Sequence, residues 1–388
     1  MKPKILRFGR DVLKAGMASA FTDTGLIDLL GAVRRAASGP RIHVLGYHRL
    51  VDKVDMGPHA GPVNPSLCIS IEAFKKQMEQ VRSRFDVLSL AEVMGVLDGR
   101  FVLERDACAI TFDDGYADVF LRARPILAEL GLPAALFVPT GYAGGTRYLP
   151  HDRLYAAVWS AFDRDLPLTE APFPPRLMPV VRGALRRALA DGPAAAVELL
   201  IERLPADSLL TLIDALETLL DGPPELDEGA RILTPDELRI LADEGWEIGA
   251  HTISHVVLTH EPPERVQREL VEPRRLLEAW TGRPCHYLAY CNGYHSPAVV
   301  EAARAAGYLG AVTTCDRWNS PGGDPMRVGR KCLWEGHTRG PDGRFSSAVS
   351  AAHLHDLFGT FGMTRPVDGE VSTSPDEEVS TPPSEVVP

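Results

Sequence analysis

The sequence predicts an α/β fold in which parallel strands alternate with helices. A short apolar run, Ala107 to Ile110, leads to Asp113 and Asp114 and then to a helical pattern from Tyr116 to Leu130. A buried run followed by a turn and a helix is typical of a βα unit. The stretch from Trp246 to Ala250 repeats the pattern and runs into His251. Because α/β sheets and barrels keep polar functional groups at the carboxyl ends of their strands, both stretches are expected at one edge.

Length and composition limit the number of domains and the classes of function. The 388 residues, 45% of them hydrophobic, suffice for two or three domains or for one barrel with an insertion. The net charge of −11 argues against a general nucleic-acid binder, because little of the chain would neutralise phosphates. The six cysteines form no CxxC pair and most lie in apolar runs, which indicates reduced thiols in a cytoplasmic protein.

Residues 1–40 form a basic N-terminal segment with a helical pattern. Up to Arg49 the chain carries nine Lys or Arg against three Asp, and charges interrupt every apolar run. This pattern excludes a secretory signal and a transmembrane helix. Two alternatives stay open: peripheral association with an anionic membrane, at the inner face, or a helix packed on the rest of the fold.

A barrel is expected over residues 41–146 and 231–360. Its first half contains a strand from Ile42 to Tyr47 that ends at His48. The further elements expected in that half are strands at 68–70, 85–90 and 134–138 and helices at 71–84 and 91–97. In the second half, Thr234 and Glu237 mark a helix start, and strands are expected at 287–290 and 310–313.

Two segments do not follow the α/β alternation. Between residues 147 and 230, leucines at helical spacing predict an insertion of three or four helices, which would form a lid or a substrate wall with His151, Tyr155 or Trp159. Residues 361–388 contain an acidic, Pro-rich, imperfect eight-residue repeat, which predicts a disordered tail.

Two motifs suggest a metal site. Adjacent carboxylates repel each other when buried, so Asp113 and Asp114 favour a metal partner or a shared proton. His251 and His255 are four residues apart, and on a helical turn both imidazoles would lie on one face and share a divalent ion. One carboxylate and two histidines leave coordination positions for water.

These stretches resemble the first two motifs of the polysaccharide deacetylases, the carbohydrate esterase group with a NodB homology domain. The strand before His48 resembles the opening strand of that family, and residues 288–293 resemble its third motif. Residues 311–325 are similar to the late strand and loop of the bacterial exopolysaccharide-type members. The resemblance implies a distorted (β/α) barrel of the NodB type, here with a helical insertion.

The resemblance also implies roles for individual residues. Asp114, His251 and His255 would bind one divalent ion, Zn²⁺ in the first place, with Co²⁺ or Ni²⁺ as alternatives. Asp113 would be the general base. For the general acid, His48 is preferred over His337, which lacks the usual apolar context. The third-motif loop of Tyr290, Cys291 and Asn292 would hold substrate and the oxyanion.

The chain departs from the family pattern in that loop. Ala289 stands where many members have an arginine that orients the base, a feature shared with the exopolysaccharide-type members, and Cys291 stands where those proteins have proline. A thiol there is a potential ligand or oxidation site.

The resulting expectation is a hydrolase of carbon–nitrogen bonds other than peptide bonds. Specifically, we expect a metal-dependent polysaccharide N-deacetylase whose partner is an N-acetylated glycan, in a polymer or on a lipid carrier. One alternative is an amide hydrolase acting on a cyclic imide or ureide. The other is a catalytically silent member that binds glycan in a synthesis complex.

Overall fold

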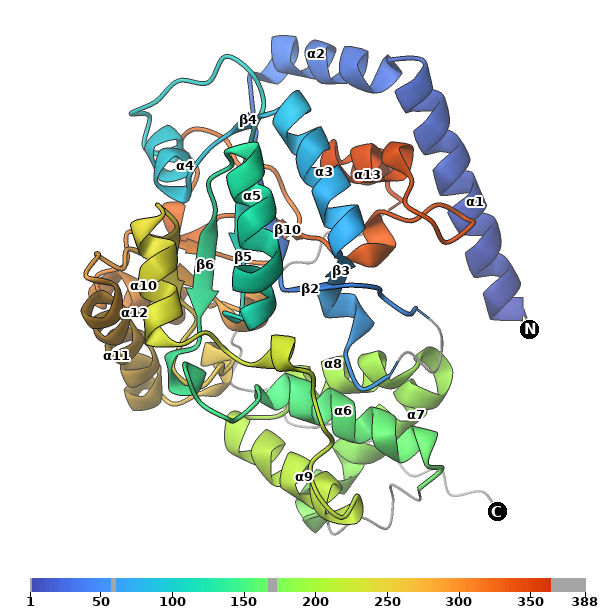
Figure 1. The fold of residues 1–388 in the computed structure, drawn as a ribbon, viewed down its shortest axis with the longest axis vertical. Coiled ribbons are helices and arrows are strands. Elements are labelled where there is room, and N and C mark those ends of the chain that lie inside the picture. Colours follow the sequence, from blue (N-terminus) through green and yellow to red (C-terminus); the bar gives the residue numbers. More distant parts are fainter. Residues whose placement is uncertain (1, 57–60, 167–172, 364–388) are drawn as a thin grey trace, which may run out of the picture.

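The computed structural model describes residues 2–56, 61–166 and 173–363. Its centre is a sheet of parallel strands, in the order β10-β1-β5-β6-β7-β8-β9 (Figure 1). The strands are β1 (Ile42–Tyr47), β5 (Ala107–Phe112), β6 (Ala135–Val138), β7 (Glu247–Ala250), β8 (Tyr287–Ala289), β9 (Gly310–Val312) and β10 (Arg330–Cys332). Val328, just before β10, pairs with Val312 of β9, so the sheet curls into a nearly closed barrel. The predicted NodB-type barrel is confirmed.

Side chains of the strands alternate between two apolar layers. In β5, Cys108, Ile110 and Phe112 face the core shared with the outer helices. Ala107 and Ala109 face the barrel interior, where they join residues such as Phe137. Burial on both faces explains why β5 is a continuous apolar run in the sequence.

Helices cover the outside of the barrel. They are α3 (Ile71–Arg84), α5 (Arg124–Leu130), α10 (Pro235–Asp243), α11 (Pro263–Thr281) and α12 (Pro297–Ala305). Helix α4 (Leu90–Leu97) packs instead against the barrel interior, because Val93 and Met94 belong to the same cluster as Phe137. The predicted start of α10 is confirmed, since Thr234 and Glu237 form a capping box there. A separate parallel pair, β2 (Arg49–Val51) and β3 (Cys68–Ser70), lies off the barrel.

Two predicted elements have different bounds. Only β4 (Asp86–Val87) forms within the predicted strand 85–90, because Ser89 forms a capping box with Glu92 and starts α4. The helix predicted from Tyr116 begins later, because Tyr116 pairs with Ile232 instead. A π-helical turn over 119–123 then leads into α5.

Among the described residues of the insertion, four α-helices follow β6, the third barrel strand along the chain, and lie beyond the carboxyl ends of the strands (Figure 1). They are α6 (Pro150–Asp163), α7 (Met178–Asp191), α8 (Pro193–Arg203) and α9 (Ala206–Leu219). Leu154, Val197, Leu212 and Ile213 belong to an apolar core that these helices share. This helical layer therefore covers the barrel edge where Asp113 and His251 emerge.

The N-terminal helices are α1 (Lys2–Asp23) and α2 (Leu26–Ser38). Ala18 packs on α13 (Ser347–Leu354) and on Phe358 of α14 (Leu357–Thr360), while α2 keeps apolar side chains in solvent, with Leu29 58% and Val33 59% exposed. No helix in the described part of the chain is long and apolar enough to cross a membrane. Most of the predicted tail, residues 364–388, lies outside the described residues.

Candidate metal centre

Parallel strands bring the predicted site residues to one edge of the barrel. The Asp113 amide donates to Tyr47 O at 2.9 Å, and the His251 amide donates to Val138 O at 3.0 Å. Each ladder therefore continues one residue past its strand, which fixes where both side chains leave the backbone. His48 follows β1 in the same way.

The three predicted ligands meet around the Asp114 carboxylate. Oδ1 of Asp114 lies 3.1 Å from Nε2 of His255 and 3.5 Å from Nε2 of His251. Two ligand atoms about 2.1 Å from one tetrahedral ion would be roughly 3.4 Å apart. Oδ1 is buried and accepts no hydrogen bond from any described residue. The donor set and its spacing therefore fit one divalent ion.

The predicted helical turn between the two histidines is wrong. Residues 251–255 form a non-helical turn in which Thr252 has φ 61° and His255 has φ 53°. The buried carboxylate of Glu269 holds this turn by accepting from the amides of Ile253 at 2.7 Å and Ser254 at 3.0 Å. Such backbone strain persists only where the surroundings impose it. The imidazoles still converge, with ring centroids 4.8 Å apart.

Hydrogen bonding fixes which nitrogen of His251 can bind an ion. Nδ1 lies 2.8 Å from the carbonyl of Ala289 and must donate to it, so the Nε2 lone pair is free on the side of Asp114. Burial lowers the pKa of His251 to about 4, which keeps the ring neutral.

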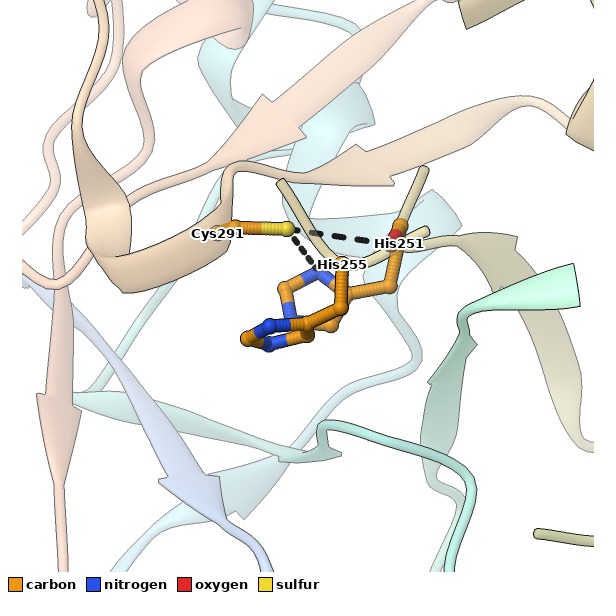
Figure 2. Close-up of side chains that lie close together, drawn as sticks. All are labelled: His251, His255 and Cys291. Atoms are coloured by element: carbon orange, nitrogen blue, oxygen red, sulfur yellow. Dashed lines mark hydrogen bonds between the residues drawn. The ribbon is translucent and has the colours of Figure 1, made fainter. Parts of the chain in front are cut away.

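Cys291 approaches His251 from the opposite side. Its Sγ lies 3.8 Å from Nδ1 of His251 (Figure 2). His251, His255 and Cys291 also offer ligand atoms within 4.8 Å of one another. However, Nδ1 of His251 is engaged with Ala289, and burial raises the pKa of the thiol well above its ordinary value. The set with Asp114 therefore fits an ion better.

Arg330 was missed by the sequence analysis. From β10, inside the barrel, its Nη1 and Nη2 donate to the two carboxylate oxygens of Asp113 at 2.8 and 2.6 Å. Burial alone would raise the pKa of Asp113, but the guanidinium holds it below its ordinary value. Arg330 thus orients the carboxylate, with Ala289 at the usual arginine position. The sequence around it gave no clear signal, because β10 consists of Arg330, Lys331 and Cys332, and two neighbouring basic residues do not indicate a buried strand.

The two histidines considered as acids lie in different places. His48 is half-buried and directly follows β1, at the barrel edge where Asp113 follows β5. It therefore belongs to the same site. His337 contacts Trp334 and His353, with ring centroids 5.4 and 4.5 Å away, and burial lowers its pKa to about 4.

Within the third-motif loop, Tyr290 makes contacts that support the fold. The amide of Tyr290 donates to Val312 O at 3.1 Å, and its hydroxyl donates to Met326 O at 3.2 Å. Tyr290 also stacks on His295. Asn292 is exposed and has a left-handed backbone with φ 55°. Tyr290 is therefore a supporting residue in this structure, and Asn292 is the more open position of the loop.

A third histidine reaches the site from α6. Nε2 of His151 lies 3.6 Å from Oδ2 of Asp114 and 2.8 Å from the Tyr116 hydroxyl, which donates to Asp152 at 2.8 Å. The Tyr116 hydroxyl donates its only proton to Asp152, so its oxygen can only accept from His151. Nε2 of His151 is therefore the donor in that hydrogen bond. This leaves Nδ1 buried without a partner among the described residues. In the sequence His151 was one of several aromatic wall residues of the insertion, and nothing there indicated its contact with Asp114.

The fold and the site define the class of protein. A parallel barrel with an Asp-Asp pair and two histidines at its carboxyl edge is the arrangement expected of the NodB-type enzymes. A family model described as "Polysaccharide deacetylase" matches residues 102–311, more than half of the chain. The chain therefore belongs to the polysaccharide deacetylase family.

Curated relatives match only part of their length. The chain is 28% identical over 83 residues to peptidoglycan-N-acetylglucosamine deacetylase of Bacillus cereus, which covers 20% of this chain and 38% of that protein. YxkH of Bacillus subtilis is 28% identical over 82 residues, 21% of this chain and 29% of that protein. The chain thus spans less than two fifths of the curated relatives it matches.

The fold is similar to that of solved structures. The deacetylase PplD of Streptococcus pyogenes, in complex with acetate, has a TM-score of 0.50 and 16% identity, covering 78% of this chain and 96% of that chain. IcaB from Ammonifex degensii has a TM-score of 0.48 and 19% identity, covering 76% and 92%.

Proposed function

We propose that this chain is a metal-dependent hydrolase that removes N-acetyl groups from an N-acetylated sugar, in a polysaccharide or a lipid-linked glycan. Membership of the polysaccharide deacetylase family supports the reaction class. Metal dependence is supported by one observation: the two neighbouring aspartates have different partners. Asp113 turns to a buried arginine, whereas Asp114 turns to His251 and His255.

The ion would be held by Asp114, His251 and His255, with Zn²⁺ as the first candidate and Co²⁺ or Ni²⁺ as alternatives. When bound, a divalent ion supplies Lewis-acid polarisation of the acetyl carbonyl and makes water more acidic. The buried ring of His251, fixed by Ala289, presents Nε2 without rearrangement. A fixed tautomer of this kind is what ligand histidines need from their surroundings.

Asp113 is the proposed general base. Arg330 keeps it ionised and in one orientation, so it can accept the proton of the attacking water. The water oxygen forms a bond to the acetyl carbon, and the bond from that carbon to the sugar nitrogen then breaks. His48, at the same edge, would donate a proton to the departing nitrogen. The products are a free amino sugar and acetate; Asp113 releases the proton it accepted to solvent, and His48 recovers its proton from solvent.

Further residues bear on the substrate and the location. The alanine at position 289 and the Tyr-His pair at 47 and 48, both found in exopolysaccharide-type members, support an N-acetylated glycan of the exopolysaccharide type, in a polymer or on a lipid carrier, as the substrate. Leu29 and Val33, exposed on α2, support peripheral attachment of a cytoplasmic protein to the inner membrane face.

Acetate release tests the proposal. Purified protein, loaded with Zn²⁺, is incubated with N-acetylated oligosaccharides and lipid-linked sugars, and acetate is measured enzymatically. Release that Asp113→Asn abolishes supports the proposal. No release from any N-acetylated sugar, by protein with one bound ion, would overturn it.

A further inference from the structure

A cavity of about 230 Å³ lies between the helical layer and the turn that carries His255. Both His151 and His255 line it, so it is continuous with the candidate metal centre. Much of its remaining wall is apolar, from α8, α9 and the residues after the turn: Ile201, Leu204, Leu209, Leu210, Val256 and Val257. The insertion therefore builds a compartment beside the proposed reacting atoms.

The apolar wall favours an alkyl group over a sugar ring. Hydroxyl groups placed against these side chains would lose their hydrogen bonds to water without replacement. Among the charged lining residues, Arg265 is paired with Glu261 at 3.1 Å and with Asp207 at 3.0 Å. Arg147 is exposed and marks the solvent side of the cavity. Tyr142, Ser254 and His260 also line the cavity, so the contact area for carbon atoms is the wall formed by α8, α9 and residues 256–257.

Size sets the length of the group. An engineered apolar cavity of about 150 Å³ accommodates benzene. A cavity of about 230 Å³ accordingly holds an alkyl group of roughly six to eight carbon atoms. The two-carbon acetyl group would fill only a fraction of it.

We propose that this cavity binds an alkyl group of the substrate. The substrate of the protein would then be an N-acylated amino sugar that carries such an alkyl group close to the scissile amide. The inference rests on the proposed deacetylase function and narrows its substrate class. The alkyl chain has two potential sources, the acyl group of the amide and a lipid aglycone. His255 is shared by the ion site and the cavity, so either source lies within reach of the reacting amide.

Two substrate series distinguish the sources, with the full-length, Zn²⁺-loaded protein. One series contains N-acyl glucosamines with two, four, six and eight acyl carbons, and the other contains methyl, butyl, hexyl and octyl glycosides of N-acetylglucosamine. Each buried methylene is worth roughly a fourfold gain in binding. We expect kcat/KM to rise at least about tenfold in one of the series up to six to eight carbons. A rise in the acyl series assigns the cavity to the acyl group, and a rise in the glycoside series assigns it to the aglycone.

A matched pair of variants connects the gain to the cavity. Leu210→Trp fills part of it, and Leu189→Trp makes the same change at a side chain of α7 that is 79% exposed. We expect Leu210→Trp to reduce the long-chain to short-chain ratio of kcat/KM at least about fivefold, and Leu189→Trp to leave it unchanged. If Leu210→Trp does not fold, Ile201→Trp replaces it.

The outcomes separate this inference from the proposed function. Deacylation of short-chain substrates with kcat/KM flat or falling along both series would overturn the cavity assignment and leave the deacetylase function standing. The cavity assignment would also be overturned if kcat/KM rises with alkyl length and Leu210→Trp does not reduce that rise. Absence of activity on every member of both series, and on the N-acetylated oligosaccharides and lipid-linked sugars as well, would instead refute the proposed function.

Discussion

Replacing Arg330 by methionine removes the guanidinium from a buried ion pair and leaves Asp113 without its partner. The side chains of Arg330 and Asp113 are 0% and 4% exposed, so solvent cannot take the place of the lost charge. Removing one member of a buried pair costs about 3–5 kcal/mol of folding free energy. The arginine also donates to the Thr111 hydroxyl at 3.0 Å and to Thr313 O at 2.9 Å, and these acceptors lose a donor too.

Replacing Arg330 by methionine should also change how the stability and kcat/KM of the protein depend on pH. In the wild type, the depressed pKa of Asp113 contributes stability above the unfolded value of about 3.9, and this is lost as pH falls through the folded pKa. In Arg330→Met, burial becomes the main influence and raises this pKa. The stability deficit of the variant should therefore be larger at pH 8 than at pH 4.5. The acid limb of kcat/KM should also move to higher pH, because the base is protonated sooner.

Urea denaturation at both pH values and a pH–rate profile check these expectations. Arg124→Met is the matched control, since Arg124 makes a bidentate pair with Glu244 on the surface, where a pair is worth about 0–1 kcal/mol. It should leave the acid limb in place. The reasoning is refuted if Arg330→Met loses less than about 1 kcal/mol and keeps the wild-type acid limb.

Four further changes probe individual roles. Asp113→Asn should keep the ion while kcat falls roughly 10²-fold to 10⁴-fold, and ion loss equal to that of Asp114→Asn would reverse the assigned roles. His48→Ala should slow acetamide hydrolysis far more than hydrolysis of an ester with a good leaving group, whereas equal losses would exclude an acid role. His151→Phe should weaken ion affinity about 10-fold to 100-fold in chelator competition, as for a residue that positions a ligand, and an unchanged affinity would assign it to packing. Glutamate at the two exposed apolar positions 29 and 33 of α2 should release the protein from anionic vesicles at low salt without changing acetate release, and unchanged vesicle binding would argue against membrane attachment.

The parts of the fold that local sequence determines were predictable. Strand β1 has the predicted bounds, because its buried run is bounded by polar residues. The residues of the Asp-Asp pair and the two histidines were visible as motifs, and the parallel arrangement of the strands brings them together. The start of α10 was predictable from Thr234 and Glu237, because the capping box that they form is a local interaction.

Contacts between distant segments were not predictable in the same way. Arg330 lies 217 positions from Asp113, and its role depends on β10 closing the barrel next to β1. His151 reaches Asp114 because α6 folds back over the strand ends, which its helical pattern alone does not encode. The turn at residues 251–255 was predicted as helical from spacing, but Glu269, from α11, holds a left-handed conformation that spacing cannot reveal.

The most direct test of the account is metal removal and return, followed in one sample by metal analysis and acetate release. Chelator-treated protein should lose activity, and one equivalent of Zn²⁺ or Co²⁺ should restore it. His255→Ala should hold little metal after the same treatment. Burial alone would lower the pKa of His255, but the Asp114 carboxylate raises it above its ordinary value. Because ligand histidines must be neutral, ion affinity should weaken as pH falls through that raised pKa. Full acetate release by metal-free wild-type protein would contradict the assignment of Asp114, His251 and His255 as the ligands of a catalytic ion.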